Sequence, residues 1–146
     1  MPFAFVDLDL LKANIRQTVA RARGKRIRIA SKSIRSLPLI ELILASHPAF
    51  QGVMCFSAPE AVWLSRRGLD DLLLGYPCWH TVQVHAICDE LRRGKTIVAM
   101  VDSIAHVEHL EACAATHGVV MPICLRYMVW PRLRTGDDKV TGRRYS

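Results

Sequence analysis

Residues 26–35 read RIRIASKSIR, a run in which apolar and polar side chains alternate as far as a lysine. Alternation with a period of two is typical of a β-strand, because successive side chains point to opposite faces. The pattern places Ile27 and Ile29 on one face, and Arg28 and Lys32 on the other. The apolar run that follows suits a helix. Lys32 is therefore expected where a strand gives way to a loop before a helix.

The position of Lys32 suggests a chemical role. In α/β folds the carboxyl ends of parallel strands form the edge where active sites collect. A lysine there can form a Schiff base if desolvation or neighbouring cations keep part of it neutral, and Arg28 and Arg35 are close in sequence. The alternative is an exposed lysine in a basic loop, since most lysines are solvated.

The rest of the chain alternates strands with helices at intervals of roughly two dozen residues, which is the parallel βα pattern. Strands are expected at 2–6, 26–32, 52–56, 71–75, 96–101 and 119–125. The intervening helices are expected to end near Gly24, Ala45, Gly68, Gly94 and Gly118. A closed eight-fold barrel needs roughly 200–250 residues. At 146 residues, this chain is expected to form an open sheet or part of a barrel.

Composition indicates a cytoplasmic globular protein. The chain is 51% hydrophobic, which is enough for one buried core, and it contains no apolar run long enough to span a membrane. Its first residues lack the basic start of a signal peptide. The five cysteines are an odd number without a CxxC pair, which favours reduced cytosolic thiols.

The net charge of +7 does not predict a nucleic-acid partner. Residues 126–146 hold six Lys/Arg and two Asp, so +4 lies in this tail and only +3 in the preceding 125 residues. Basic and aromatic residues are not interleaved as in single-strand binders. The tail has neither a helix nor a strand period, and it is expected to be a poorly ordered end.

Several motifs resemble one known family. They lie at 5–15 (FVDLDLLKANI), 28–32 (RIASK), 57–61 (SAPEA), 68–77 (GLDDLLLGYP) and 101–103 (VDS). Together they resemble the alanine racemase N-terminal domain superfamily, the fold-type III pyridoxal-phosphate enzymes. The D-threonine aldolase and D-serine dehydratase branch is the closer match. The resemblance covers about residues 3–125.

The resemblance implies a partial (β/α)8 TIM-type barrel over 1–125, followed by a divergent tail over 126–146. It implies pyridoxal 5'-phosphate as cofactor and Lys32 as the catalytic Schiff-base lysine. Tyr76, at the end of the third core strand, can border the cofactor or be a turn tyrosine with a solvated hydroxyl. The implied partner is a small-molecule amino-acid substrate, and the full-length family allows a homodimer.

The reaction stays open between racemisation, aldol cleavage and deamination of D-amino acids. The aldolase branch usually has proline and histidine where this chain has Ile29 and Ala30. No later strands or C-terminal β-domain are recognised, so little activity is expected from this chain alone. The alternatives are a non-catalytic pyridoxal-phosphate-binding protein and an incomplete product without function.

A second cluster has the spacing of metal ligands. His106, His109, Cys113 and His117 fall on one face of the expected last helix, where i,i+3 and i,i+4 pairs could hold a metal. This face lies opposite the apolar stripe that begins at Ile104. A solvated polar face explains the pattern better, and no metal site is predicted.

Overall fold

The computed structural model describes residues 5–126, in which five strands form one parallel sheet in the order β1-β2-β3-β4-β5. The strands are β1 (Ile27–Ala30), β2 (Phe50–Cys55), β3 (Leu72–Leu74), β4 (Ile97–Val101) and β5 (Ile123–Leu125). Each strand pairs with its neighbour in the sequence. Strand order therefore follows chain order, without the reversal that marks a doubly wound sheet.

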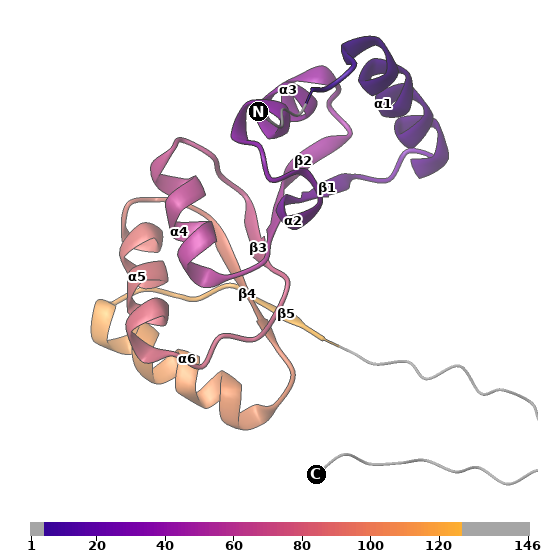
Figure 1. Cartoon of the computed structure of the whole chain (residues 1–146). Helices are drawn as coiled ribbons and strands as arrows, with labels where there is room; N and C mark the ends of the chain where they lie inside the picture. Colours follow the sequence, from indigo (N-terminus) through magenta and orange to yellow (C-terminus); the bar gives the residue numbers. More distant parts are fainter. Residues whose placement is uncertain (1–4, 127–146) are drawn as a thin grey trace, which may run out of the picture.

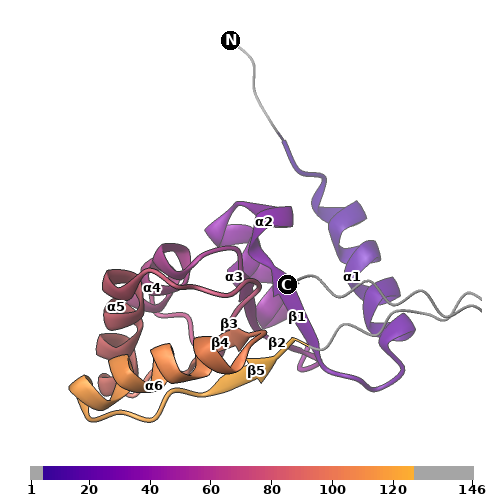
Figure 2. The ribbon, with the colours of Figure 1, turned by 90° about the horizontal axis from the view of Figure 1, so that it is seen from below.

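Six helices accompany the sheet among the described residues (Figure 1). They are α1 (Leu8–Ala22), α2 (Ser31–Ile34), α3 (Leu37–Ser46), α4 (Ala58–Arg66), α5 (Thr81–Arg92) and α6 (Ile104–His117). Figures 1 and 2 both show α4, α5 and α6 gathered together on one side of the sheet, whereas α1 lies at its β1 end. None of the described helices is long and apolar enough to cross a membrane.

Side-chain caps explain where three of the helices begin. Asp7 accepts hydrogen bonds from the backbone N–H groups of Asp9 and Leu10 at the start of α1. Ser57 caps α4 and Ser103 caps α6, each by accepting from the N–H three residues later. These side chains replace partners that the first turn of a helix lacks.

The core lies between the sheet and the helices. Along β4, Ile97, Ala99 and Val101 are buried against the helices, while Val98 and Met100 on the other face are only partly buried. In β3, Leu73 is likewise less buried than its two neighbours. A strand made only of leucines is typical of a sheet that is covered on both faces. Among the described residues, only the helix face is fully covered.

A bulge in β2 lies at the amino end of the sheet, between Arg28 of β1 and Asp71 just before β3. The pairing of β1 with β2 shifts by one residue between Ile27 and Ile29, beside Gly52, whose φ is +49°. A Cβ atom at Gly52 would lie 1.8 Å from the carbonyl oxygen of Asp71 and 2.7 Å from Nη1 of Arg28. The guanidinium of Arg28 donates to both the backbone and the side-chain oxygens of Asp71. The bulge therefore leaves room for this ion pair.

A buried carboxylate connects α4 to α5. Glu90 is 1% exposed, and it accepts hydrogen bonds from Ser65 (2.8 Å), Arg66 (3.0 Å) and Arg93 (2.9 Å). Burial alone would raise the pKa of Glu90. The Ser65 hydroxyl and the two guanidinium charges outweigh burial, and they hold that pKa below its ordinary value.

The core strands and the helix order agree with the sequence, but the strand expected at 2–6 is wrong where it can be seen. Phe5 and Val6 are irregular, because the chain enters the capped start of α1 at once. The tail expected at 126–146 lies outside the described residues, apart from Arg126.

Candidate functional site

Lys32 lies at the carboxyl edge of the sheet, but not on the strand itself. β1 ends at Ala30, and Lys32 is the second residue of α2, a single helical turn closed by Arg35 at φ +51°. The alternating pattern had carried the strand two residues too far. The side chain of Lys32 is exposed, and within the described residues it forms no ion pair.

The ammonium group of Lys32 is next to Tyr76. Its Nζ atom donates a hydrogen bond of 3.1 Å to the Tyr76 hydroxyl oxygen, and it lies 5.4 Å from the centre of the ring. Tyr76 follows β3 and is 45% exposed. The hydrogen bond from Lys32 and the lysine's charge lower the pKa of the Tyr76 phenol, with a smaller contribution from Arg126. The structure thus brings together both predicted site residues.

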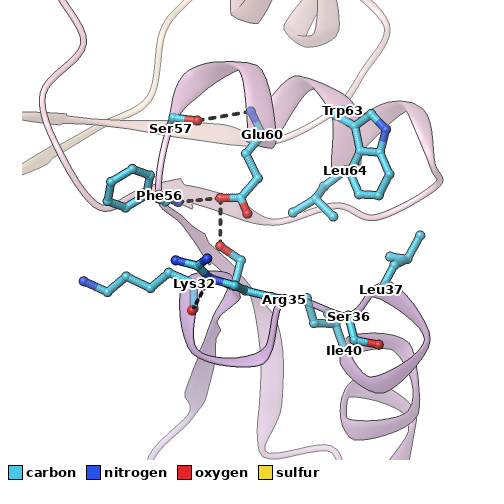
Figure 3. A pocket seen from close by; sticks show the side chains of 11 residues that line it. Lys32, Arg35, Ser36, Leu37, Ile40, Phe56, Ser57, Glu60, Trp63 and Leu64 are labelled. Carbon is cyan, nitrogen blue, oxygen red and sulfur yellow. Dashed lines mark hydrogen bonds between the residues drawn. The ribbon is translucent and has the colours of Figure 1, made fainter. Parts of the chain in front are cut away.

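The carboxylate of Glu60, on α4, connects α2 to the end of β2 (Figure 3). Oε2 of Glu60 accepts a hydrogen bond of 2.8 Å from Ser31 Oγ and one of 2.6 Å from the backbone N–H of Phe56. Ser31 immediately precedes Lys32. The Phe56 ring packs edge to face on Tyr76, with ring centres 5.5 Å apart. Glu60 therefore contacts one neighbour of each member of the Lys32–Tyr76 pair.

A cavity of about 380 Å³ lies between α2, α3 and α4. Its polar side includes Ser31, Ser57 and Glu60, and its other side is apolar, with Ile40 and Leu64 among the lining residues. Figure 3 shows the Lys32 side chain extending away from the apolar side. Lys32 thus lines the cavity while its amine points away from the apolar side.

Arg28 does not take part in the site as predicted. It is committed to Asp71 at the amino end of the sheet, since both of its terminal nitrogens bond there. Arg35 does lie beside Lys32, but its Nε donates to the Lys32 carbonyl oxygen at 3.1 Å. The expected pair of cations around the lysine is therefore not formed.

The histidine face of α6 is packed inward, which overturns the expected solvated face. His106 is 0% exposed, and its Nε2 lies 3.0 Å from the Cys78 carbonyl oxygen. Trp79 stacks on the rings of His106 and His109. Of the expected apolar stripe, Leu110 and Ala114 are buried, whereas Ile104 is 79% exposed. Within residues 5–126 no three His, Cys, Asp or Glu side chains are placed to hold a metal ion.

The helices α5 and α6 share a second histidine contact. Nδ1 of His85 lies 2.8 Å from Nε2 of His117, whose other ring nitrogen lies 3.3 Å from Asp89. One of the two facing nitrogens must carry a proton and the other must accept it. This contact joins the neighbouring helices α5 and α6.

A partial signal for the role of Glu60 is present in the sequence. The serine-to-glutamate spacing at 57–60 predicts a capping box, in which the glutamate side chain bonds back to the N–H of the cap residue. The serine half of that box is present. The carboxylate instead bonds to the N–H of Phe56, one residue earlier, and to Ser31 from another element.

The geometry can now be compared with known proteins. The model of the family described as alanine racemase, N-terminal domain, matches residues 6–129. The chain belongs to this family.

Two kinds of relative of this alanine racemase N-terminal domain support the fold. The chain is 28% identical over 124 residues to 3-hydroxy-D-aspartate aldolase of Paracoccus denitrificans, covering 84% of this chain and 32% of the relative. The structure of D-threonine aldolase from Filomicrobium marinum superposes with a TM-score of 0.77 at 18% identity. That superposition covers 88% of this chain and 35% of the other.

A variant of D-threo-3-hydroxyaspartate dehydratase also superposes, with a TM-score of 0.73, 23% identity, and coverage of 82% of this chain and 31% of that one. The chain spans about a third of the length of these relatives. The five parallel strands are therefore part of a (β/α)8 barrel that is incomplete here, as the sequence predicted.

Proposed function

We propose that this chain is the pyridoxal-phosphate-binding portion of an enzyme that acts on D-amino acids, with Lys32 as its Schiff-base lysine. The observation that carries the proposal is the exposed Lys32 amine at the carboxyl edge of the sheet, 3.1 Å from the Tyr76 hydroxyl. The relatives named above are aldolases and a dehydratase of D-amino acids, which supports this substrate class.

The residues present fit a cofactor that carries an aldehyde. A primary amine condenses with an aldehyde only if it can lose its proton, and an ion pair with a carboxylate would oppose that loss. Lys32 has the hydroxyl of Tyr76 beside it instead of a carboxylate. When bound, pyridoxal phosphate supplies an electron sink for a carbanion at the α-carbon of the amino acid.

Each residue of the pair has a distinct task in this proposal. The Lys32 amine holds the cofactor and can take a proton on the face of the substrate where it stands. The Tyr76 hydroxyl keeps the lysine side chain at the strand edge, and Tyr76 borders the cofactor. Racemisation requires a second base on the opposite face, whereas aldol cleavage or elimination requires activation of the leaving group. The reaction type therefore depends on groups beyond this pair.

The proposal includes a cytoplasmic location and, in the full-length family, a homodimer. All five cysteines lie within the described residues and are free, which supports a reducing compartment.

A trapping experiment tests the cofactor site. The purified chain is titrated with pyridoxal phosphate, reduced with borohydride, and mapped by peptide mass spectrometry. The chain has five lysines, and we expect the adduct to concentrate at Lys32. Lys32→Ala should lose the adduct, whereas Lys25→Ala, which removes another exposed lysine, should retain it.

Two outcomes would change the proposal. Labelling spread evenly over Lys12, Lys25 and Lys95 would show that no cofactor site is formed. Adduct at Lys32 without turnover of any D-amino acid, even after the remaining two thirds of a relative is supplied in trans, would favour a non-catalytic pyridoxal-phosphate-binding protein.

A further inference from the structure

We propose that Glu60 is a positioning residue, which holds Lys32 and Tyr76 against each other by anchoring the residue next to each of them. This inference deepens the proposed function and rests on it for the chemical role of Lys32. The contacts themselves do not depend on any cofactor. Five links form a closed ring: Glu60 to Ser31, Ser31 to Lys32 along the chain, Lys32 to Tyr76, Tyr76 to Phe56, and Phe56 to Glu60.

The hydrogen bond between Glu60 and Ser31 orients α2. A helix of four residues has few hydrogen bonds of its own, so contacts with the rest of the protein decide its orientation. Its first residue, Ser31, is 2% exposed, and its hydroxyl lies 2.8 Å from Glu60 and 3.3 Å from the Met54 carbonyl oxygen. No side chain caps this turn at Ala30. The bond to Glu60 is therefore the main polar anchor of the turn that carries Lys32.

The hydrogen bond between Glu60 and Phe56 orients the aromatic pair of Phe56 and Tyr76. The backbone N–H of Phe56 donates to Glu60 at 2.6 Å, just after β2 ends. This bond fixes the backbone from which the Phe56 ring extends to the edge-to-face contact with Tyr76, with an interplanar angle of 72°. Phe56 is 57% exposed, so the surrounding core does little to hold it. The position of Tyr76 thus depends in part on Glu60.

A carboxylate suits this task better than a neutral acceptor. Both donors reach the same oxygen, Oε2, and hydrogen bonds to an ionised acceptor are roughly twice as strong as neutral ones. The ordinary alternative is that Glu60 only stabilises α4, since an acidic residue in the first turn interacts favourably with the helix dipole. The two roles predict different results at Tyr76.

The test reads the Tyr76 phenol directly, by ultraviolet titration of tyrosinate in the whole chain without cofactor. The signal of Tyr76 is obtained by subtracting the curve of Tyr76→Phe, because the chain has three tyrosines. Lys32 lowers the pKa of Tyr76, so loosening their contact should raise it toward its ordinary value of 10.0. We expect Glu60→Ala to produce this rise. Glu60→Gln, which keeps one acceptor oxygen, should restore much of the shift.

Ser57→Ala is the matched control. It removes the side-chain cap of α4 but leaves the Glu60 carboxylate in place, so it should lower the melting temperature without moving the Tyr76 titration. If Ser57→Ala and Glu60→Ala lower stability alike and neither moves the titration, Glu60 only stabilises the helix and the inference fails.

A second readout connects Glu60 to the cofactor. Glu60→Ala should slow trapping of pyridoxal phosphate at Lys32 by about tenfold or more, because misplacing a reacting group by about 1 Å costs up to about a hundredfold. If Glu60→Ala shifts the Tyr76 titration but the wild type traps no pyridoxal phosphate at Lys32, the proposed function is contradicted and the positioning role is upheld. Trapping that is unchanged in Glu60→Ala, together with an unchanged titration, would contradict the positioning role alone.

Discussion

The Nζ atom of Lys32 and the hydroxyl oxygen of Tyr76 lie 3.1 Å apart, although 44 positions separate these residues in the chain. The contact spans β1 and β3, which are not adjacent in the sheet. It is possible because both residues leave the sheet at its carboxyl edge, with β2 ending between them.

Replacing the lysine should therefore change how the tyrosine titrates. In Lys32→Met, the pKa of Tyr76 should rise toward its ordinary value, since both the hydrogen bond and the positive charge are lost. The phenol would then ionise at a higher pH than in the wild type, which tyrosinate absorbance measures. Lys25→Met removes a charge elsewhere on the surface and should leave the curve in place. An unshifted curve for Lys32→Met would show that the two side chains are not in contact in solution.

Gly52 should be the glycine that tolerates alanine least. Gly52→Ala would place a methyl group on the Asp71 carbonyl and the Arg28 guanidinium, in a left-handed backbone. We expect a loss of at least about 2 kcal/mol in the free energy of unfolding, measured with urea. Gly94→Ala is the control, because its φ of +80° is equally unfavourable for alanine but no atom lies within 4 Å. It should lose about 1 kcal/mol. Equal losses would mean that the bulge is not tightly packed.

Glu90 should make stability depend on pH in the acid range. Because its pKa in the folded protein is below the unfolded value of 4.5, its contribution is present above about pH 4.5 and is lost as the pH falls through the folded pKa. Glu90→Gln should cost about 2 kcal/mol at pH 7, allowing for the solvent exposure of Arg66 and Arg93. The difference from the wild type should shrink at pH 3.

Urea titrations at the two pH values test this prediction. Glu111→Gln, on the exposed face of α6, should match the wild type at both. A cost for Glu90→Gln that is the same at pH 3 and pH 7 would show that packing, and not charge, explains the role of Glu90.

Cysteine reactivity should follow burial. Burial raises the pKa of Cys55 to about 12, with a further contribution from the charge of Glu60, and burial also raises the pKa of Cys88. Since the thiolate is the reactive form, neither should react with iodoacetamide at pH 8 in the folded protein. Cys124, which is partly exposed on β5, should react first. Cys124→Ser should remove the fast phase, and fast labelling of Cys55 would indicate that β2 opens readily.

The thiol of Cys55 should also destabilise the folded protein at alkaline pH. An unfolded thiol ionises near pH 9, whereas Cys55 in the folded chain stays protonated to about pH 12. The protein should lose stability as the pH rises through this interval, and less so in Cys55→Ala, once the cavity cost of that substitution at neutral pH is subtracted.

Much of the fold could be predicted because its signals are local. Short apolar runs mark β2, β3 and β4, and each strand pairs with its neighbour in sequence. The caps Asp7 and Ser57 are likewise local, because each lies within one helical turn of the N–H group from which it accepts. Such signals depend on neighbouring residues alone, so a sequence reveals them without knowledge of the tertiary structure.

The rest depends on contacts between distant residues. Glu60 and Ser31 are bonded across 29 positions of the sequence, and Arg28 and Asp71 across 43. No local sequence pattern predicts either pair. On α6, periodicity correctly placed Leu110 and Ala114 in the core, but it did not show that His106 and Cys113 are buried beside them. His106 is covered by Trp79, which comes from the loop between β3 and α5 and stacks on the imidazole ring. Large flat rings can fill a core as well as aliphatic side chains do.

The sequential order of the strands affects when the Lys32 site can form during synthesis. Each of the five described strands adds to the one made just before it, so the growing chain can pair each of them without waiting for a distant segment. Lys32, Glu60 and Tyr76 all belong to the first three strand–helix units. Once those units have left the ribosome, the lysine already has all the partners described here, whatever the chain adds afterwards.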